Sequence, residues 1–170
     1  DAVTTILGGA YASNNKEQIS DALAFLAKIT MITSAIAFLG ALSAPFIAQG
    51  LYGNWHIGIY AGFVVIASVI STTAYSFTMI VLQVVGRIKH MMLLGLLDQL
   101  LRSSLALVMV LIGLKVFGVA LGHLIGALVV CTVSVFIWQN IKRAFPIIPS
   151  VRGLLRHINN VSIKKYLRFS

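Results

Sequence analysis

The sequence has very few charged residues. Asp and Glu number 4 and Lys and Arg 13 in 170 residues, so only 10% of the chain is charged, against about 25% in soluble domains. From Ile29 to Gly86 there is no Asp, Glu, Lys or Arg. A bilayer span needs only about 20 apolar residues. The uncharged stretch can therefore cross a membrane twice, with its turn at residues 51–56, and a soluble domain is excluded.

The sequence also has little cysteine and lacks the residue motifs that are typical of metal sites and catalytic sites. The single Cys131 excludes an internal disulfide. No two histidines have metal-ligand spacing with Cys or a carboxylate, so no metal site is expected. The chain has no Gly-rich phosphate loop after a strand and no recognisable Ser–His–acid pattern. We therefore expect neither a cofactor nor an enzymatic activity.

Apolar residues dominate what remains. They make up 59% of the chain, and the mean hydropathy is +0.97. Helices are the expected secondary structure, because they pair their own backbone groups, whereas open strands would leave backbone groups unpaired in hydrocarbon. The sequence predicts an all-α, polytopic transmembrane helix bundle with four full spans, at about 28–50, 57–86, 91–113 and 116–141. Pro45 is expected to kink the first span.

Shorter segments flank this transmembrane region of residues 16–145. Residues 1–15 resemble the end of a preceding helix and a cytoplasmic break rather than a signal peptide, which would begin with basic residues. We therefore expect the chain to be a piece of a longer protein. Residues 146–170 form a basic cytoplasmic tail in which Leu154, Leu155 and Ile158 alternate with polar residues. Either an amphipathic helix on an anionic leaflet or a disordered tail fits this pattern.

The basic residues predict an orientation. The net charge of +9 would indicate nucleic acid in a soluble protein, but most of these residues flank apolar spans. There they orient helices and meet anionic headgroups, so membrane lipids are the expected partners and nucleic acid is not. Because basic loops stay cytoplasmic, we expect a multi-pass plasma-membrane protein with both termini in the cytosol. Residues 52–56 and Lys115 would then lie outside.

Small residues predict where helices pack. Gly118, Gly122 and Gly126 recur every four residues, and Gly58 and Gly62 repeat the spacing. Such stripes let helix backbones approach closely in lipid. The first two spans are also rich in hydroxyl side chains, which either bond back to their own helices or line a polar cavity. These residues are Thr30, Thr33, Ser34, Ser43, Ser68, Ser71, Thr72, Thr73 and Ser76.

One pair of charges lies inside a predicted span. Asp98 and Arg102 are four residues apart, so they share a helix face. If the span begins near Met91, Arg102 lies about 17 Å along it, close to the bilayer midplane. Each charge costs about 3 kcal/mol at that depth unless it is paired. The pair is either a functional site facing a polar interior or an internal salt bridge that neutralises itself.

Several short motifs occur in a characteristic order. A long helix beginning near Lys16 is followed by APFI at 44–47 and LYG at 51–53, then by LQVVGR at 82–87 and FGVALG at 117–122. This succession resembles the C-terminal part of polysaccharide biosynthesis (Wzx-type) oligosaccharide flippases, in the multidrug/oligosaccharidyl-lipid/polysaccharide exporter superfamily. The resemblance covers roughly residues 4–141. It implies that the four spans belong to a larger two-lobe transporter with a central cavity.

The resemblance also implies a task. A flippase moves lipid-linked oligosaccharide or polysaccharide precursors between leaflets by alternating access. Its partners would be the lipid-linked glycan and the remaining helices of a longer transporter. Arg102, Arg87 and Lys89 could attract the lipid phosphate, with Asp98 beside Arg102. A drug or metabolite exporter of the same superfamily and a small four-helix membrane scaffold are the alternatives.

Overall fold

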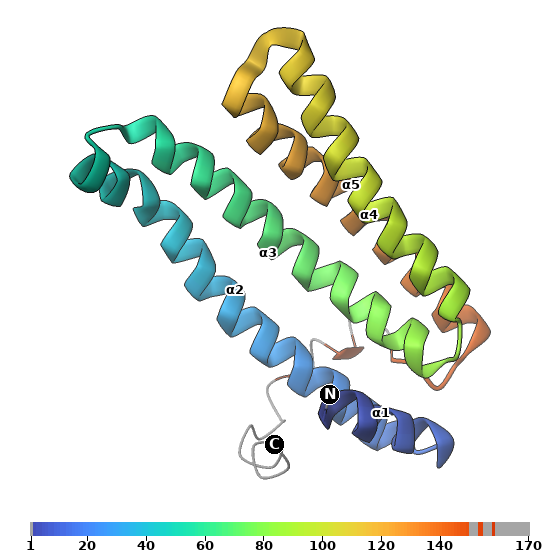
Figure 1. Ribbon diagram of the computed structural model, residues 1–170. Helices are drawn as coiled ribbons and strands as arrows, with labels where there is room; N and C mark the ends of the chain where they lie inside the picture. The colour runs from blue at the N-terminus through green and yellow to red at the C-terminus, as the bar shows by residue number, and fades with distance from the viewer. Residues whose placement is uncertain (1, 150–152, 155–157, 159–170) are drawn as a thin grey trace.

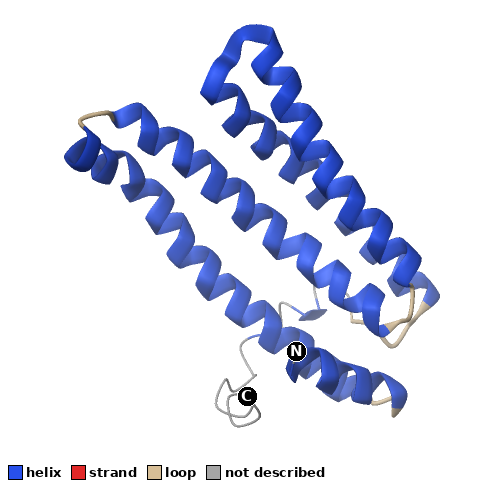
Figure 2. Ribbon diagram, viewed as in Figure 1, coloured by secondary structure: helices blue, strands red, loops and turns tan. Residues whose placement is uncertain are grey.

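The structure is a computed structural model that describes residues 2–149, 153–154 and 158. All regular secondary structure in this part of the chain is helical, which confirms the all-α prediction (Figure 2). The elements are α1 (Ala2–Ala12), α2 (Lys16–Tyr52), α3 (Trp55–Val84), α4 (Ile88–Met109), the π-helical turn η1 (Val110–Leu114) and α5 (Lys115–Ala144).

The long helices form two antiparallel pairs. Figure 1 shows α2 beside α3 and α4 beside α5, and α3 packs against both α2 and α5. The α2–α3 turn and η1 lie at one end of the molecule. The short helix α1, the α3–α4 turn and the C-terminal end of α5 lie at the other end, which we call the basal end. The four long helices therefore run side by side in the order α2, α3, α5, α4.

Local capping sets the ends of α2. The Asn15 side chain accepts a hydrogen bond from the backbone N–H of Gln18, and Gly53 closes the helix at φ 64°, with its N–H donating to Gln49 O. The predicted span began at residue 28 because hydropathy rises only there. The helix itself begins at Lys16, where the sequence motifs predicted the start of a long helix. In its first turns Ile19 and neighbouring residues are buried in the basal core. Pro45 lies inside the helix.

Three helical runs are long and apolar enough to cross a membrane, judged by length and composition among the described residues. They are α2, α3 and the continuous run Ile88–Ala144. This supports a multi-pass membrane protein. The third run contains both of the last two predicted spans, and it folds back on itself (Figure 1). Gly113, at φ 97°, and Lys115, at φ 48°, reverse the chain so that α5 packs against α4.

The buried core lies toward the basal end. Its largest fully buried side chains include Leu7, Leu23 and Leu82, and Leu154 and Ile158 of the C-terminal segment join it. Most of the predicted tail, residues 150–152, 155–157 and 159–170, lies outside the described residues. The prediction of either an amphipathic helix or a disordered tail concerns these residues.

Large apolar side chains are exposed along α2 and α4, as lipid-facing surfaces require. They include Ile36, Leu39, Phe46, Met92, Leu96 and Leu100.

Candidate functional site

Close contact between α4 and α5 positions the charged pair. A Cβ atom built on Gly122 would lie 2.5 Å from Ala106 Cα, and one on Gly126 would lie 3.0 Å from Arg102 Cγ. At Gly118 the corresponding atom would meet the Met109 carbonyl. The stripe predicted from the sequence thus lies against α4, and it holds the α4 backbone at Arg102 directly against α5.

The second predicted glycine pair lies at the α2–α3 contact. A Cβ atom on Gly58 would collide with the backbone of Ala44 and Pro45, and one on Gly62 would lie 3.0 Å from the Ala41 carbonyl oxygen. Both glycines are buried. The α3 backbone is therefore fitted to α2 at the end opposite the basal end.

Asp98 and Arg102 form an ion pair on α4. Arg102 Nε donates to Asp98 Oδ1 at 2.7 Å, and Arg102 Nη2 donates across the helix boundary to Ser71 Oγ on α3. Asp98 is only 6% exposed and Ser71 5%. The two charges thus lie between α3 and α4 rather than against lipid, and one guanidinium connects the two helices.

Tyr75 adds a second hydroxyl to this group. It lies one turn after Ser71 on α3, and its hydroxyl oxygen would be 3.4 Å from a Cβ atom on Gly95 of α4. The phenol is close enough to interact electrostatically with both Asp98 and Arg102. Because Gly95 has no side chain, α4 leaves room for the ring. We call Ser71, Tyr75, Asp98 and Arg102 the charged cluster.

The structure does not bring the other two candidate residues to this cluster. Arg87 precedes α4, and its guanidinium lies 5.5 Å from the centroid of the Phe145 ring. Lys89 is exposed in the first turn of α4. At 1.5 Å per residue, Arg87 is about 22 Å along the helix from Arg102. The four candidates therefore form two groups, one at the basal end and one well inside the bundle.

The hydroxyl side chains of the first two predicted spans were expected either to bond back to their own helices or to line a polar cavity, and most of them bond back. Thr33 donates to Ile29 O, Ser68 to Val64 O and Thr72 to Ser68 O. Ser71 is the informative exception, because its oxygen accepts from Arg102 instead. Neither Ser71 nor Tyr75 was predicted from the sequence as a partner of the charged pair. Their spacing of four residues in a hydroxyl-rich segment was the available signal.

No group of three or more His, Cys, Asp or Glu side chains that could hold a metal ion occurs within the described part of the chain. No protein-family model, curated protein or solved structure matches this sequence.

Proposed function

We propose that this chain forms part of a membrane transporter that flips lipid-linked oligosaccharide or polysaccharide precursors by alternating access. The observation that carries the proposal is the Asp98–Arg102 pair and its bond to Ser71, set among helices that are apolar enough to cross a membrane. Ionisable residues inside membrane spans are costly, and they commonly mark the paths of substrates and ions.

The chemistry of the charged cluster suits an anionic group. An arginine has five N–H donors in a planar fork that matches phosphate oxygens. One donor of Arg102 goes to Asp98 and one to Ser71, so the guanidinium has further donors for a phosphate. The hydroxyls of Ser71 and Tyr75 could bond a sugar. Arg87 and Lys89, at the basal end, would attract the headgroup before it enters.

The proposed topology follows from the two ends of the bundle. If the fold at Gly113 divides the third run, α4 and α5 cross separately, and their 22 and 30 residues are long enough to do so. Basic residues gather at the basal end, whereas Lys115 lies at the other. The basal end would then face the cytosol across a plasma membrane, and we propose the cytosol for both termini of the chain. The exposed apolar faces of α2 and α4 would meet lipid or the remaining helices of a two-lobe transporter.

Replacing both Asp98 and Arg102 with Leu tests this role. The double variant removes the charges without leaving either one unpaired, so we expect it to insert and fold. We also expect the double variant to lose glycan export in cells. The separate variant Arg102→Lys, which keeps the charge, should retain only part of the activity because the planar fork is lost. Membrane insertion and glycan export are scored separately in the full protein.

Leu96 and Leu100 provide the matched control, because they are also four residues apart on α4 but face outward, 57% and 59% exposed. Replacing both with Ala should leave export unchanged. Normal export by the double Leu variant of Asp98 and Arg102 would overturn the proposed role. It would instead favour a four-helix scaffold in which the two charges serve only each other.

A further inference from the structure

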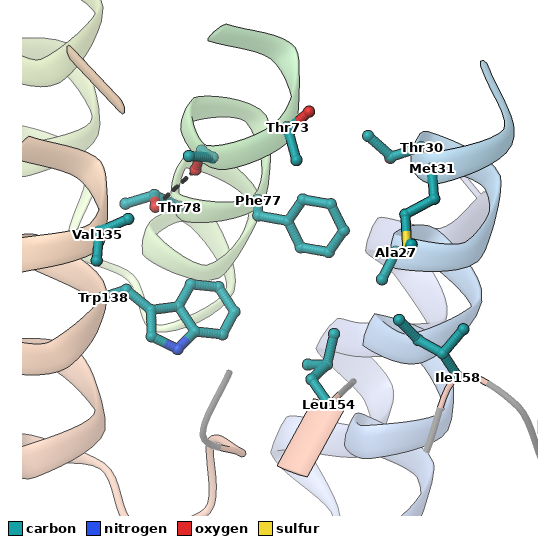
Figure 3. A pocket seen from close by; sticks show the side chains of 11 residues that line it. Ala27, Thr30, Met31, Thr73, Phe77, Thr78, Val135, Trp138, Leu154 and Ile158 are labelled. Atoms are coloured by element: carbon teal, nitrogen blue, oxygen red, sulfur yellow. Dashed lines mark hydrogen bonds between the residues drawn. The ribbon is translucent and has the colours of Figure 1, made fainter. Parts of the chain in front are cut away.

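An apolar pocket opens between α2, α3 and α5. Its volume is about 200 Å³. Figure 3 shows Phe77 and Trp138 on one side, Met31 on the opposite side, and Leu154 and Ile158 at the basal end. These side chains offer a hydrocarbon surface.

Two of the three threonine hydroxyls that line the pocket, those of Thr73 and Thr78, are already bonded to helix carbonyls. Thr73 donates to Val69 O at 2.7 Å, and Thr78 donates to Ala74 O at 2.9 Å, with Ser134 O 3.2 Å away. The lining therefore presents little that could bind a sugar or a peptide backbone. An occupant must be largely apolar, since a polar group would lose its bonds to water without replacement.

One polar atom in the lining has no partner. Trp138 is 6% exposed, and within the described residues its indole Nε1–H is buried without an acceptor. A buried donor without an acceptor is destabilising. The nitrogen lies on the lower edge of the ring in Figure 3, on the side of the basal end. A hydrogen-bond acceptor arriving from that end would satisfy it after a small movement of the side chains that cover it.

The surroundings of the pocket are basic. Lys28 directly follows the lining residue Ala27, and Lys142 and Arg143 lie about one turn after Trp138, where both are exposed. Basic residues at the end of apolar helices attract anionic lipid headgroups, and tryptophans are enriched at this depth.

We infer that this pocket is a binding site for one acyl chain of an anionic phospholipid from the leaflet that meets the basal end. The acyl chain lies between Phe77, Trp138 and Met31, an ester or phosphate oxygen accepts from Trp138 Nε1, and the basic residues hold the headgroup. The inference depends on the membrane location of the helices and not on the proposed transport activity.

Fluorescence quenching by brominated lipids tests the site directly. In a Trp55→Phe background, Trp138 is the sole tryptophan. The protein is placed in vesicles of equal phosphatidylglycerol and phosphatidylcholine in which only one of the two lipids carries bromine. We expect brominated phosphatidylglycerol to show about a fivefold higher apparent occupancy at Trp138, the preference given by one basic residue. Equal quenching by the two lipids would overturn the inference.

Variants of two neighbouring threonines can distinguish lipid bound in the pocket from lipid bound on the rest of the surface. Thr73 lines the pocket and Thr72 does not, although both are exposed and both donate to the carbonyl four residues earlier at 2.7 Å. We expect Thr73→Phe to abolish the lipid preference and Thr72→Phe to retain it. A preference that survives in Thr73→Phe would show that lipid outside the pocket causes it.

A second pair of variants keeps the test valid if Thr73→Phe fails to fold. Met31 and the adjacent Ile32 are both exposed on α2, but only Met31 lines the pocket. Met31→Phe should reduce the quenching difference and Ile32→Phe should leave it unchanged. Circular dichroism of each variant shows that it is folded, and an identical response of the two variants would contradict the inference.

Discussion

At the scale of single residues, Arg102 is the side chain that connects two of the buried polar groups, Asp98 and Ser71. It neutralises Asp98 on its own helix and donates to Ser71 on α3. A hydrogen bond to a charged group contributes about 1.5–3 kcal/mol, more than one between neutral groups. The cross-helix bond is therefore a measurable part of the α3–α4 contact.

Ser71→Ala tests this contribution. We expect the variant to lose about 1.5–3 kcal/mol of unfolding free energy in detergent micelles, because Arg102 loses its partner on α3. Ser68→Ala is the control, since Ser68 is exposed and bonds only to Val64 O on its own helix. Equal stability of the two variants would show that the bond to Ser71 contributes nothing net.

At the scale of helices, the glycines decide how closely the long elements approach. Gly122 allows the α5 backbone to lie against Ala106 of α4, where even a methyl group would collide. Without a hydrophobic driving force between helices in lipid, this close packing is a main source of their association.

Replacing Gly122 with Leu should therefore separate α4 from α5. We expect a large loss of the folded fraction, measured by size-exclusion chromatography and thermal unfolding in detergent. Gly40→Leu is the control, because Gly40 lies inside α2 with no neighbouring atom within 4 Å of the added Cβ. If Gly122→Leu were as stable as Gly40→Leu, the glycine stripe would have no packing role.

The sequence predicted helices better than it predicted their contacts. Hydropathy located the apolar runs, and the expectation of a long helix beginning near Lys16 is confirmed, although the first turns of that helix pack on protein and lie outside the apolar run. The i,i+4 spacing of Asp98 and Arg102 predicted their ion pair, because both lie on one helix. The partnership with Ser71 depends on the register between α3 and α4, which no periodicity within one helix encodes.

At the scale of the whole molecule, the two ends of the bundle differ in charge. The basal end holds α1, the α3–α4 turn with Arg87 and Lys89, and the end of α5 with Lys142 and Arg143. The opposite end has Lys115. This asymmetry is the physical basis of the proposed orientation, because basic residues next to spans remain on the cytosolic side.

Cysteine labelling of intact cells tests the orientation in a Cys131→Ser background. His56→Cys lies in the first turn of α3 at the end opposite the basal end, and Ser13→Cys lies in the basal break between α1 and α2; both positions are exposed. We expect an impermeant maleimide to label His56→Cys in intact cells and Ser13→Cys only after permeabilisation. The reverse pattern would place the basal end outside.

The fold at Gly113 also has a consequence for how the protein is made. The turn between α4 and α5 is built from apolar residues and Gly113, with Lys115 following, so a long hydrophilic loop does not separate the two arms. α4 carries Asp98 and Arg102, whereas the part of α5 that packs on it is uncharged. During synthesis the insertion machinery would therefore receive α4 and α5 as one helical hairpin. The more apolar second arm would help to retain the first in the bilayer while Arg102 pairs with Ser71 of α3, which is made earlier.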